Sequence, residues 1–188
     1  MTDWQILNQK TVYKNPWFRV EKKRIKRSDN TQGDYFTLRR FNSHGFVVVM
    51  AQDKKQNLVL IKQFRPTLMA YTWEVPMGGI EKHEQPIQAA QRELLEETSL
   101  KAKSWQEVGQ FYVGAGHTDL KGTIFLATDL FKSKQQASGE PGEIIDQTKR
   151  ISLTNLEKQI RNGKIQDGPT ISSFYLSKPY LKMKKESK

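Results

Sequence analysis

Three glutamates in the middle of the chain lie at helical spacing, and they are the residues best suited to chemistry. Glu93, Glu96 and Glu97 are three and four residues apart, so an α-helix places all three on one face. Converging carboxylates are what a hard, oxygen-seeking cation such as Mg²⁺ requires, and Arg92 stands four residues before Glu96, where it can orient that side chain. The pattern predicts a metal site, although a solvated, glutamate-rich helix face has the same spacing.

A longer pattern surrounds these glutamates. Residues 78–100 read GGIEKHEQPIQAAQRELLEETSL and resemble the Nudix box, G-x5-E-x7-R-E-U-x-E-E-x-G-U, in which U is a bulky apolar residue. The matching positions are Gly78, Glu84, Arg92, Glu93, Leu94, Glu96, Glu97 and Leu100. The departure is Ser99, where the family has Gly. Because that Gly normally forms the turn after the helix, the resemblance does not fix the backbone shape of this turn.

Segments on both sides of the box resemble the ADP-ribose pyrophosphatase branch of this family. KQFRP at 62–66 and WEVPMG at 73–78 resemble the run before the box, GHTD at 116–119 the loop after it, and GEPGE at 139–143 a late acidic loop. The resemblance covers residues 10–177 and implies metal-dependent hydrolysis of ADP-ribose to AMP and ribose 5-phosphate. The implied cofactor is Mg²⁺, with Mn²⁺ as an alternative.

The resemblance implies roles for the residues of the box. Glu93 and Glu97 are expected to be the main metal ligands, with Glu96 bridging or assisting and the backbone carbonyl of Met77 completing the metal shell. Glu96 and Arg92 are also expected to serve catalysis, with Arg92 holding the carboxylates in orientation.

Further roles are implied outside the metal ligands. The general base of this branch comes from the late loop, which offers Glu143 and, as the alternative, Glu140. Substrate contacts are implied for Arg65, Arg40, Trp17, Gly78 and His117. For Arg65 the competing interpretation is a surface ion pair, and for Trp17 it is ordinary core packing.

Two departures from the branch leave the substrate open. Residues 112–116 contain no Pro, and Leu120 stands where the branch often has Glu. The alternative substrate is therefore a nucleoside diphosphate sugar of the GDP-mannose or UDP-glucose type.

The composition narrows the class of protein. The chain has 188 residues and no cysteine, which excludes disulfides, cysteine zinc sites and thiol nucleophiles and fits a reducing compartment. The longest apolar run, residues 46–51, is far shorter than the about 20 residues needed to span a bilayer. We therefore expect a cytoplasmic enzyme with no membrane partner.

The formal net charge of +11 raises a second alternative, an RNA-binding or RNA-end-processing protein. Residues 1–45 carry +6 and residues 178–188 carry +4, whereas the residues between them carry only +1. The excess therefore lies outside the box. We expect a basic periphery that attracts an anionic diphosphate, which argues against a nucleic-acid-binding core.

Among the elements that must position these residues, strands outnumber helices, and the helices are scattered between the strands. This pattern predicts an α/β (α+β layered) fold, in which a mixed β-sheet lies between helices. Turn signals between β-branched and aromatic runs predict an antiparallel meander over residues 1–42. The runs at 46–51 and 58–64 are expected to form a hairpin. Further strands are expected at 71–76, 105–113 and 122–128.

Three helices are expected to cover these strands. The second is expected to begin with a capping box of Thr154 and Glu157, and the third to bury Phe174 and Tyr175. The expected helices are residues 86–98, residues 154–162 and a helix opened by Pro169.

The chain is expected to have three parts. Residues 1–42 form the meander, residues 43–177 the Nudix hydrolase domain, and residues 178–188 a basic, disordered tail. Since the meander pairs two subunits in the family that the box resembles, a homodimer is implied, with a small-molecule nucleoside diphosphate as substrate.

Overall fold

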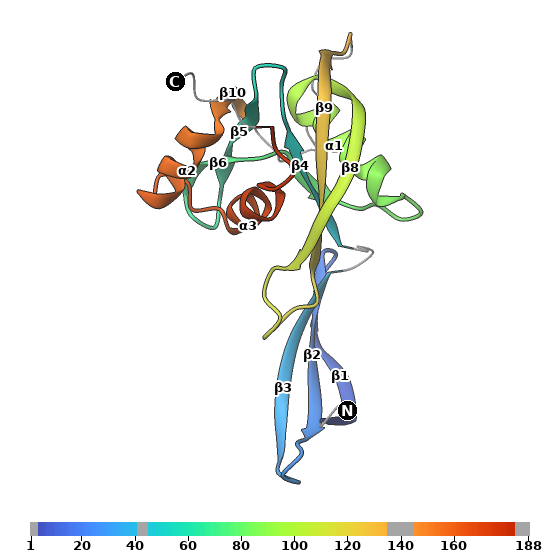
Figure 1. Ribbon diagram of the computed structural model, residues 1–188. Helices are drawn as coiled ribbons and strands as arrows, with labels where there is room; N and C mark the ends of the chain where they lie inside the picture. The colour runs from blue at the N-terminus through green and yellow to red at the C-terminus, as the bar shows by residue number, and fades with distance from the viewer. Residues whose placement is uncertain (1–3, 41–44, 135–144, 183–188) are drawn as a thin grey trace.

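The N-terminal strands form a sheet of their own, which projects from the rest of the molecule (Figure 1). The computed structural model describes residues 4–40, 45–134 and 145–182. Three antiparallel strands in the order β1-β2-β3 make the projecting sheet: β1 (Gln5–Lys14), β2 (Phe18–Lys26) and β3 (Gln32–Arg40). This is the meander that the sequence predicts.

The body of the molecule contains two further sheets. The larger has the order β7-β4-β9-β8 and consists of β4 (Phe46–Ala51), β7 (Met77–Gly79), β8 (Leu100–Tyr112) and β9 (Lys121–Lys132). The smaller has the order β10-β5-β6 and consists of β5 (Asn57–Arg65), β6 (Ala70–Glu74) and β10 (Ile145–Ser152). The pairing of β4 with β9 is parallel, so the larger sheet is mixed.

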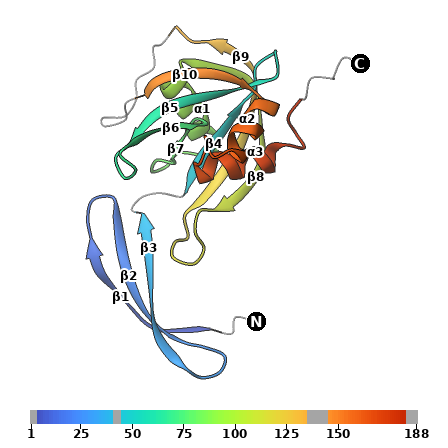
Figure 2. The ribbon, with the colours of Figure 1, turned by 90° about the vertical axis from the view of Figure 1, so that its left-hand side faces the viewer.

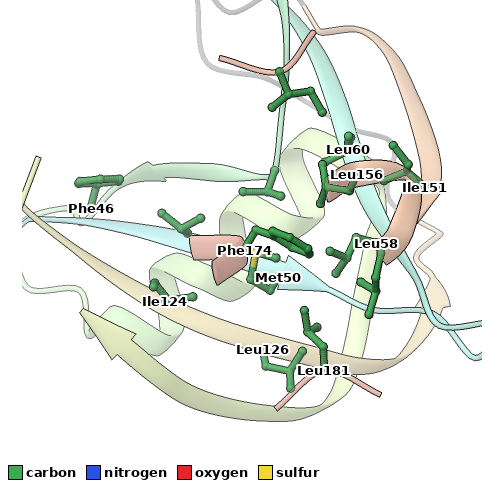
Figure 3. Close-up of a cluster of buried hydrophobic side chains, with 14 residues drawn as sticks. Phe46, Met50, Leu58, Leu60, Ile124, Leu126, Ile151, Leu156, Phe174 and Leu181 are labelled. Carbon is green, nitrogen blue, oxygen red and sulfur yellow. The ribbon is translucent and has the colours of Figure 1, made fainter. Parts of the chain in front are cut away.

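The central strand β4 is covered by helices on both faces, as the layered fold predicts. Val47 and Val49 point toward α1 (Pro86–Thr98), where they meet Ala90 and Leu94. The alternate side chains of β4 point the other way and join a second cluster, in which Figure 3 shows Met50 beside Phe174. The latter residue comes from α3 (Gly168–Ser177), and α2 (Leu153–Arg161) closes the same cluster.

The predicted hairpin of residues 46–51 with residues 58–64 is wrong. Strands β4 and β5 belong to different sheets, and only an isolated bridge between Gln52 and Leu58 joins their ends. All of β4 and the apolar part of β5, residues 58–61, are buried, and such apolar runs carry no alternation that would show which strand pairs with which.

Two details of the C-terminal helices also differ from expectation. The N-cap of α2 is Ser152, whose hydroxyl accepts a hydrogen bond from the Asn155 N–H, so the capping box predicted at Thr154 is wrong. In α3, Phe174 is fully buried but Tyr175 is 42% exposed. The small side chains of Ser173 and other hydroxyl residues complete the buried face of α3, and these are not apolar enough to mark it in the sequence.

The packed body extends beyond α3. Leu181 is buried in the core, and the side chain of Gln52 bonds both the N–H and the carbonyl of Lys182. The tail expected from residue 178 onward therefore begins no earlier than residue 183. In the described ranges, no helix is both long and apolar enough to cross a membrane.

Candidate active site

Helix α1 presents its acidic residues along the edge that faces β7. It begins with Pro86 at its first turn, and its apolar stripe packs against β4. That packing fixes the rotation of the helix and leaves Glu93 and Glu97 only 4% and 2% exposed. Burial of two carboxylates this complete is rare unless they are paired or bind a cation.

Arg92 lies at the centre of the acidic residues, as the spacing predicts. Its Nη1 donates to Oε1 of Glu93 at 2.8 Å and to Oε2 of Glu96 at 3.1 Å. Its Nε and Nη2 donate to the two carboxylate oxygens of Glu84 at 3.0 and 3.1 Å, and Nη2 also donates to the Gly79 carbonyl at 2.8 Å. One guanidinium thus orients three carboxylates of the box.

These contacts shift the pKa values of both partners. The hydrogen bond from Arg92 lowers the pKa of Glu84 below its ordinary value, against the opposing effect of burial. Burial opposes the charge of Arg92, but its hydrogen bond to Glu84 and the charge of Glu93 raise its pKa above the ordinary value. Both groups therefore stay ionised at neutral pH.

Strand β7 lies against Glu93 and Glu97. The N–H of Met77 donates to Oε2 of Glu97 at 3.0 Å. At Gly78 a Cβ atom would stand 1.9 Å from Oε1 of Glu93, so only glycine lets the backbone approach this closely. The structure thus brings Met77 and Gly78 into the site, and ligation by the Met77 carbonyl stays a prediction.

The chemistry of this donor set fits a divalent cation. Four glutamates of the box against Arg92 leave a net charge of −3, and all the donors are hard oxygens. Over residues 4–40, 45–134 and 145–182, however, no three acidic or histidine side chains form a ready-made metal cage. Since Mg²⁺ is usually held by one or two carboxylates together with substrate phosphates, the site suits a cation that arrives with the diphosphate.

Arg65 forms an ion pair, as its competing interpretation predicts. Its Nε and Nη2 donate to the two oxygens of Glu74 at 2.8 and 2.5 Å, and the side chain remains one-third exposed. Glu74 is 1% exposed and also accepts a hydrogen bond from the Thr72 hydroxyl. The sequence does not identify this pairing, although a single charge between the apolar Trp73 and Val75 indicates that a partner is needed if the segment is buried.

The remaining candidates lie where the meander meets the body. Trp17 is 69% exposed, which excludes the core-packing interpretation. Arg40 lies at the same end of the meander as Trp17, because it pairs with the next residue, Phe18. The His117 carbonyl accepts the N–H of Leu38, so its loop is bonded to β3. Figure 2 shows this junction below the body. Glu140 and Glu143 lie outside the described residues.

Comparisons with known proteins agree with this geometry. The model of the NUDIX domain matches residues 42–173, and that of the nucleoside diphosphate sugar hydrolase N-terminal domain matches residues 4–38. The chain is 29% identical to an ADP-ribose pyrophosphatase of Bacillus subtilis over 140 residues, which is 74% of this chain and 73% of that protein.

Two further matches span nearly the whole chain. The ADP compounds hydrolase NudE of Escherichia coli is 24% identical over 177 residues, covering 94% of this chain and 92% of that protein. A crystal structure of an ADP compounds hydrolase superposes with a TM-score of 0.80 at 21% identity, covering 95% of this chain and 94% of that one. The latter likeness shows that the fold includes the meander as well as the body.

Proposed function

The chain belongs to the Nudix hydrolase family, and on that premise we propose that it hydrolyses the diphosphate bond of ADP-ribose, giving AMP and ribose 5-phosphate. Enzymes of this family depend on divalent metal ions. The observation that carries the proposal is the Arg92-centred group of carboxylates, packed against Met77 and Gly78. The similarity to an ADP-ribose pyrophosphatase over three-quarters of the chain supports the choice of substrate.

The residues of the chain divide the work of this reaction. Glu93 and Glu97, assisted by Glu96 and the Met77 carbonyl, would hold Mg²⁺, which when bound offsets the charge of the diphosphate. Arg92 orients Glu93 and Glu96, and the Met77 N–H orients Glu97, before the cation arrives. Arg65, held by its ion pair with Glu74 and one-third exposed, is proposed to contact the diphosphate.

The bond-breaking step needs a base for water. Glu143, or alternatively Glu140, accepts a proton from a water molecule while the oxygen of that water attacks one phosphorus atom of the diphosphate. The bridging phosphorus–oxygen bond then breaks, and each product leaves with one phosphate group. Arg40 is proposed to contact the diphosphate together with Arg65, Trp17 to stack on the base across the dimer, and His117 to contact the substrate from its loop.

A nucleoside diphosphate sugar is the second candidate substrate. The match of residues 4–38 to the nucleoside diphosphate sugar hydrolase N-terminal domain favours it. The test is kcat/KM with Mg²⁺ and with Mn²⁺ for ADP-ribose, GDP-mannose, UDP-glucose and a 5′-triphosphate RNA. We expect ADP-ribose to lead by at least tenfold. A clear preference for another substrate would reject ADP-ribose.

We also propose a homodimer assembled through the meander. All ten residues of β1 are exposed, and this edge strand carries the apolar side chains of Ile6, Leu7, Val12 and Tyr13. An exposed apolar edge strand is a template for another chain, which a second copy would cover. A cytoplasmic location is part of the proposal and rests on the absence of cysteine.

A further inference from the structure

A cavity of about 440 Å³ lies on the outer side of α1, where this helix meets the larger sheet. Its walls come from α1, from the start of β8 and from the end of β9, which pack beside one another (Figure 1). Pockets that bind small molecules have volumes of about 300–1,000 Å³, so this cavity is large enough for one. Among the described residues that line it, none belongs to the meander.

Apolar side chains form most of the cavity wall. Trp105 packs against the core beneath α1, and its indole N–H donates to the Ala102 carbonyl at 3.2 Å, which holds the ring in one orientation. Phe131 comes from β9 and is 43% exposed, and Leu95 comes from α1 and is half-buried. Two aromatic side chains at one small cavity suit a planar ring, because aromatic groups attract one another face to face with an offset or edge to face.

The charge at the rim of the cavity is positive. Lys101 is exposed and lies opposite Phe131 in the pairing of β8 with β9, so a cation adjoins the aromatic wall. Gln91 of α1 adds a neutral amide that can donate a hydrogen bond. Among the described residues that line the cavity, none is acidic. This arrangement is complementary to a ligand that carries a negative group beside its ring.

Arg92 connects the cavity with the carboxylate group of the candidate active site. It lines the cavity, yet all five N–H groups of its guanidinium already donate, four to glutamate oxygens of the box and one to the Gly79 carbonyl. A ligand can therefore pack against Arg92 without taking over a hydrogen bond from it. Such packing restricts the arginine to the arrangement that orients the carboxylates.

We propose that this cavity binds a planar aromatic anion, and that its occupant stabilises the carboxylate group through Arg92. The ring contacts Trp105 and Phe131, and the negative group meets Lys101 at the rim. Two sources supply this chemistry: an aromatic carboxylate, or a nucleoside monophosphate such as the product of the proposed reaction. The coupling through Arg92 rests on the proposed function, whereas the binding site does not.

Direct binding tests the site without catalysis. Indole-3-acetate and its neutral isostere indole-3-acetamide are titrated calorimetrically into the full-length protein in EDTA, which removes any metal. The carboxylate should bind about threefold more tightly than the amide, the scale of an ion pair that stays partly in water. Lys101→Gln should remove this preference and leave the binding of the amide unchanged. Phe131→Ala should weaken both probes by about fivefold, the scale of one aromatic contact.

Two matched controls remove the same groups outside the cavity. Lys103→Gln changes an exposed lysine of the same strand, and Tyr180→Ala changes an aromatic residue beyond α3 that is 47% exposed. Both variants should keep the wild-type Kd values. A misfolded variant would lose both probes, whereas Lys101→Gln should lose only the preference between them. The proposal is overturned if indole-3-acetate does not bind at millimolar concentration, or if Tyr180→Ala weakens it as much as Phe131→Ala does.

AMP separates the two sources of the ligand. If the reaction product is the ligand, AMP should displace indole-3-acetate from the wild-type protein, and Phe131→Ala and Lys101→Gln should each weaken the binding of AMP. If an aromatic carboxylate is the ligand, indole-3-acetate should bind with the same Kd whether or not AMP is present.

The coupling is measured as a pair of affinities, without substrate. Saturating Mg²⁺ should tighten the Kd of indole-3-acetate by at least about twofold, and indole-3-acetate should tighten the Kd of Mg²⁺ by the same factor, because such coupling is reciprocal. Glu97→Gln, which removes a proposed metal ligand, should abolish the factor. Equal affinities with and without Mg²⁺ would overturn the coupling. Failure of ADP-ribose hydrolysis would reject the proposed function and leave the calorimetric results standing.

Discussion

The main-chain N–H of Met77 donates a hydrogen bond of 3.0 Å to Oε2 of Glu97. Three residues earlier, Glu74 holds the guanidinium of Arg65, and between them the Val75 N–H donates to the Thr170 hydroxyl at 3.1 Å. A short stretch of backbone, anchored at each step, thus fixes the proposed diphosphate-binding arginine relative to the proposed metal ligand.

Replacing Glu97 by Gln should separate its charge from its structural role. The amide oxygen of Gln can still accept the Met77 N–H, so the melting temperature should change little. The loss of a charged metal ligand should lower the release of AMP from ADP-ribose by at least about 100-fold. Activity is measured with saturating Mg²⁺, alongside a melting curve. Wild-type turnover in a folded variant would contradict the role given to Glu97.

Ser99 ends α1 in a left-handed conformation, with φ of 56°, and its N–H donates to the Leu95 carbonyl. A side chain at such a φ costs about 1–2 kcal/mol relative to glycine. Ser99→Gly should therefore raise the free energy of unfolding by up to about 1 kcal/mol, since the more flexible unfolded chain offsets part of the gain. Urea unfolding measures this. Ser99→Ala, as the comparison, should give no gain.

Asp167 is the N-cap of α3, but burial destabilises its charged form. Its carboxylate accepts the Thr170 N–H at 2.8 Å, but burial and the charge of Glu74 raise its pKa above the ordinary value, despite the attraction of Arg65. A raised pKa in the folded state means that stability falls as the pH rises from the unfolded value of 3.8 through the folded pKa. Above the folded pKa, Asp167 is charged in the folded protein, and its buried charge then lowers the free energy of unfolding most.

Asp167→Asn should therefore raise the free energy of unfolding at pH 7, because Asn is an equally good N-cap without the charge. The gain should shrink as the pH falls and vanish near pH 3, where both states of the wild type are protonated. Urea unfolding at several pH values measures the difference. A loss of stability at pH 7 would show that the charge itself strengthens the cap.

Val12 offers a test of the proposed dimer. It is 46% exposed on the edge strand β1, in a chain of net charge +11. Val12→Lys places two further positive charges at the interface of a dimer and should shift it to monomers in sedimentation analysis. Phe131→Lys, at a residue 43% exposed on the body, is the matched control and should leave the dimer intact. A monomeric wild-type protein would contradict the proposal directly.

The helix of the box is the element that the sequence predicts best. The expected span of residues 86–98 coincides with α1, because Pro86 sets its start and the apolar stripe sets its rotation. The contact of Arg92 with Glu96 follows from the helical spacing of four residues and is therefore local. Local spacing is information that a sequence carries directly.

Non-local partners were not predictable in the same way. Arg65 and Glu74 meet because two strands pair in one register, and a one-residue slip would move them to opposite faces. Leu38 meets Thr118 only because β3 lies against the loop between β8 and β9, a contact that no spacing in the sequence reveals. The meander and most strands of the body were predicted, but β7 and β10 were not, and the arrangement of the strands depends on packing.

The parallel pairing of β4 with β9 has a consequence for synthesis on the ribosome. All six residues of β4 are buried, yet their partners in β9, such as Gly122 opposite Phe46, emerge 76 residues later, which takes about 4–15 seconds at about 5–20 residues per second. During most of that interval this fully buried strand can pair only with the short strand β7, and its other edge has no neighbour. The nascent chain is therefore most prone to aggregate, and most in need of a chaperone, between the emergence of β4 and that of β9.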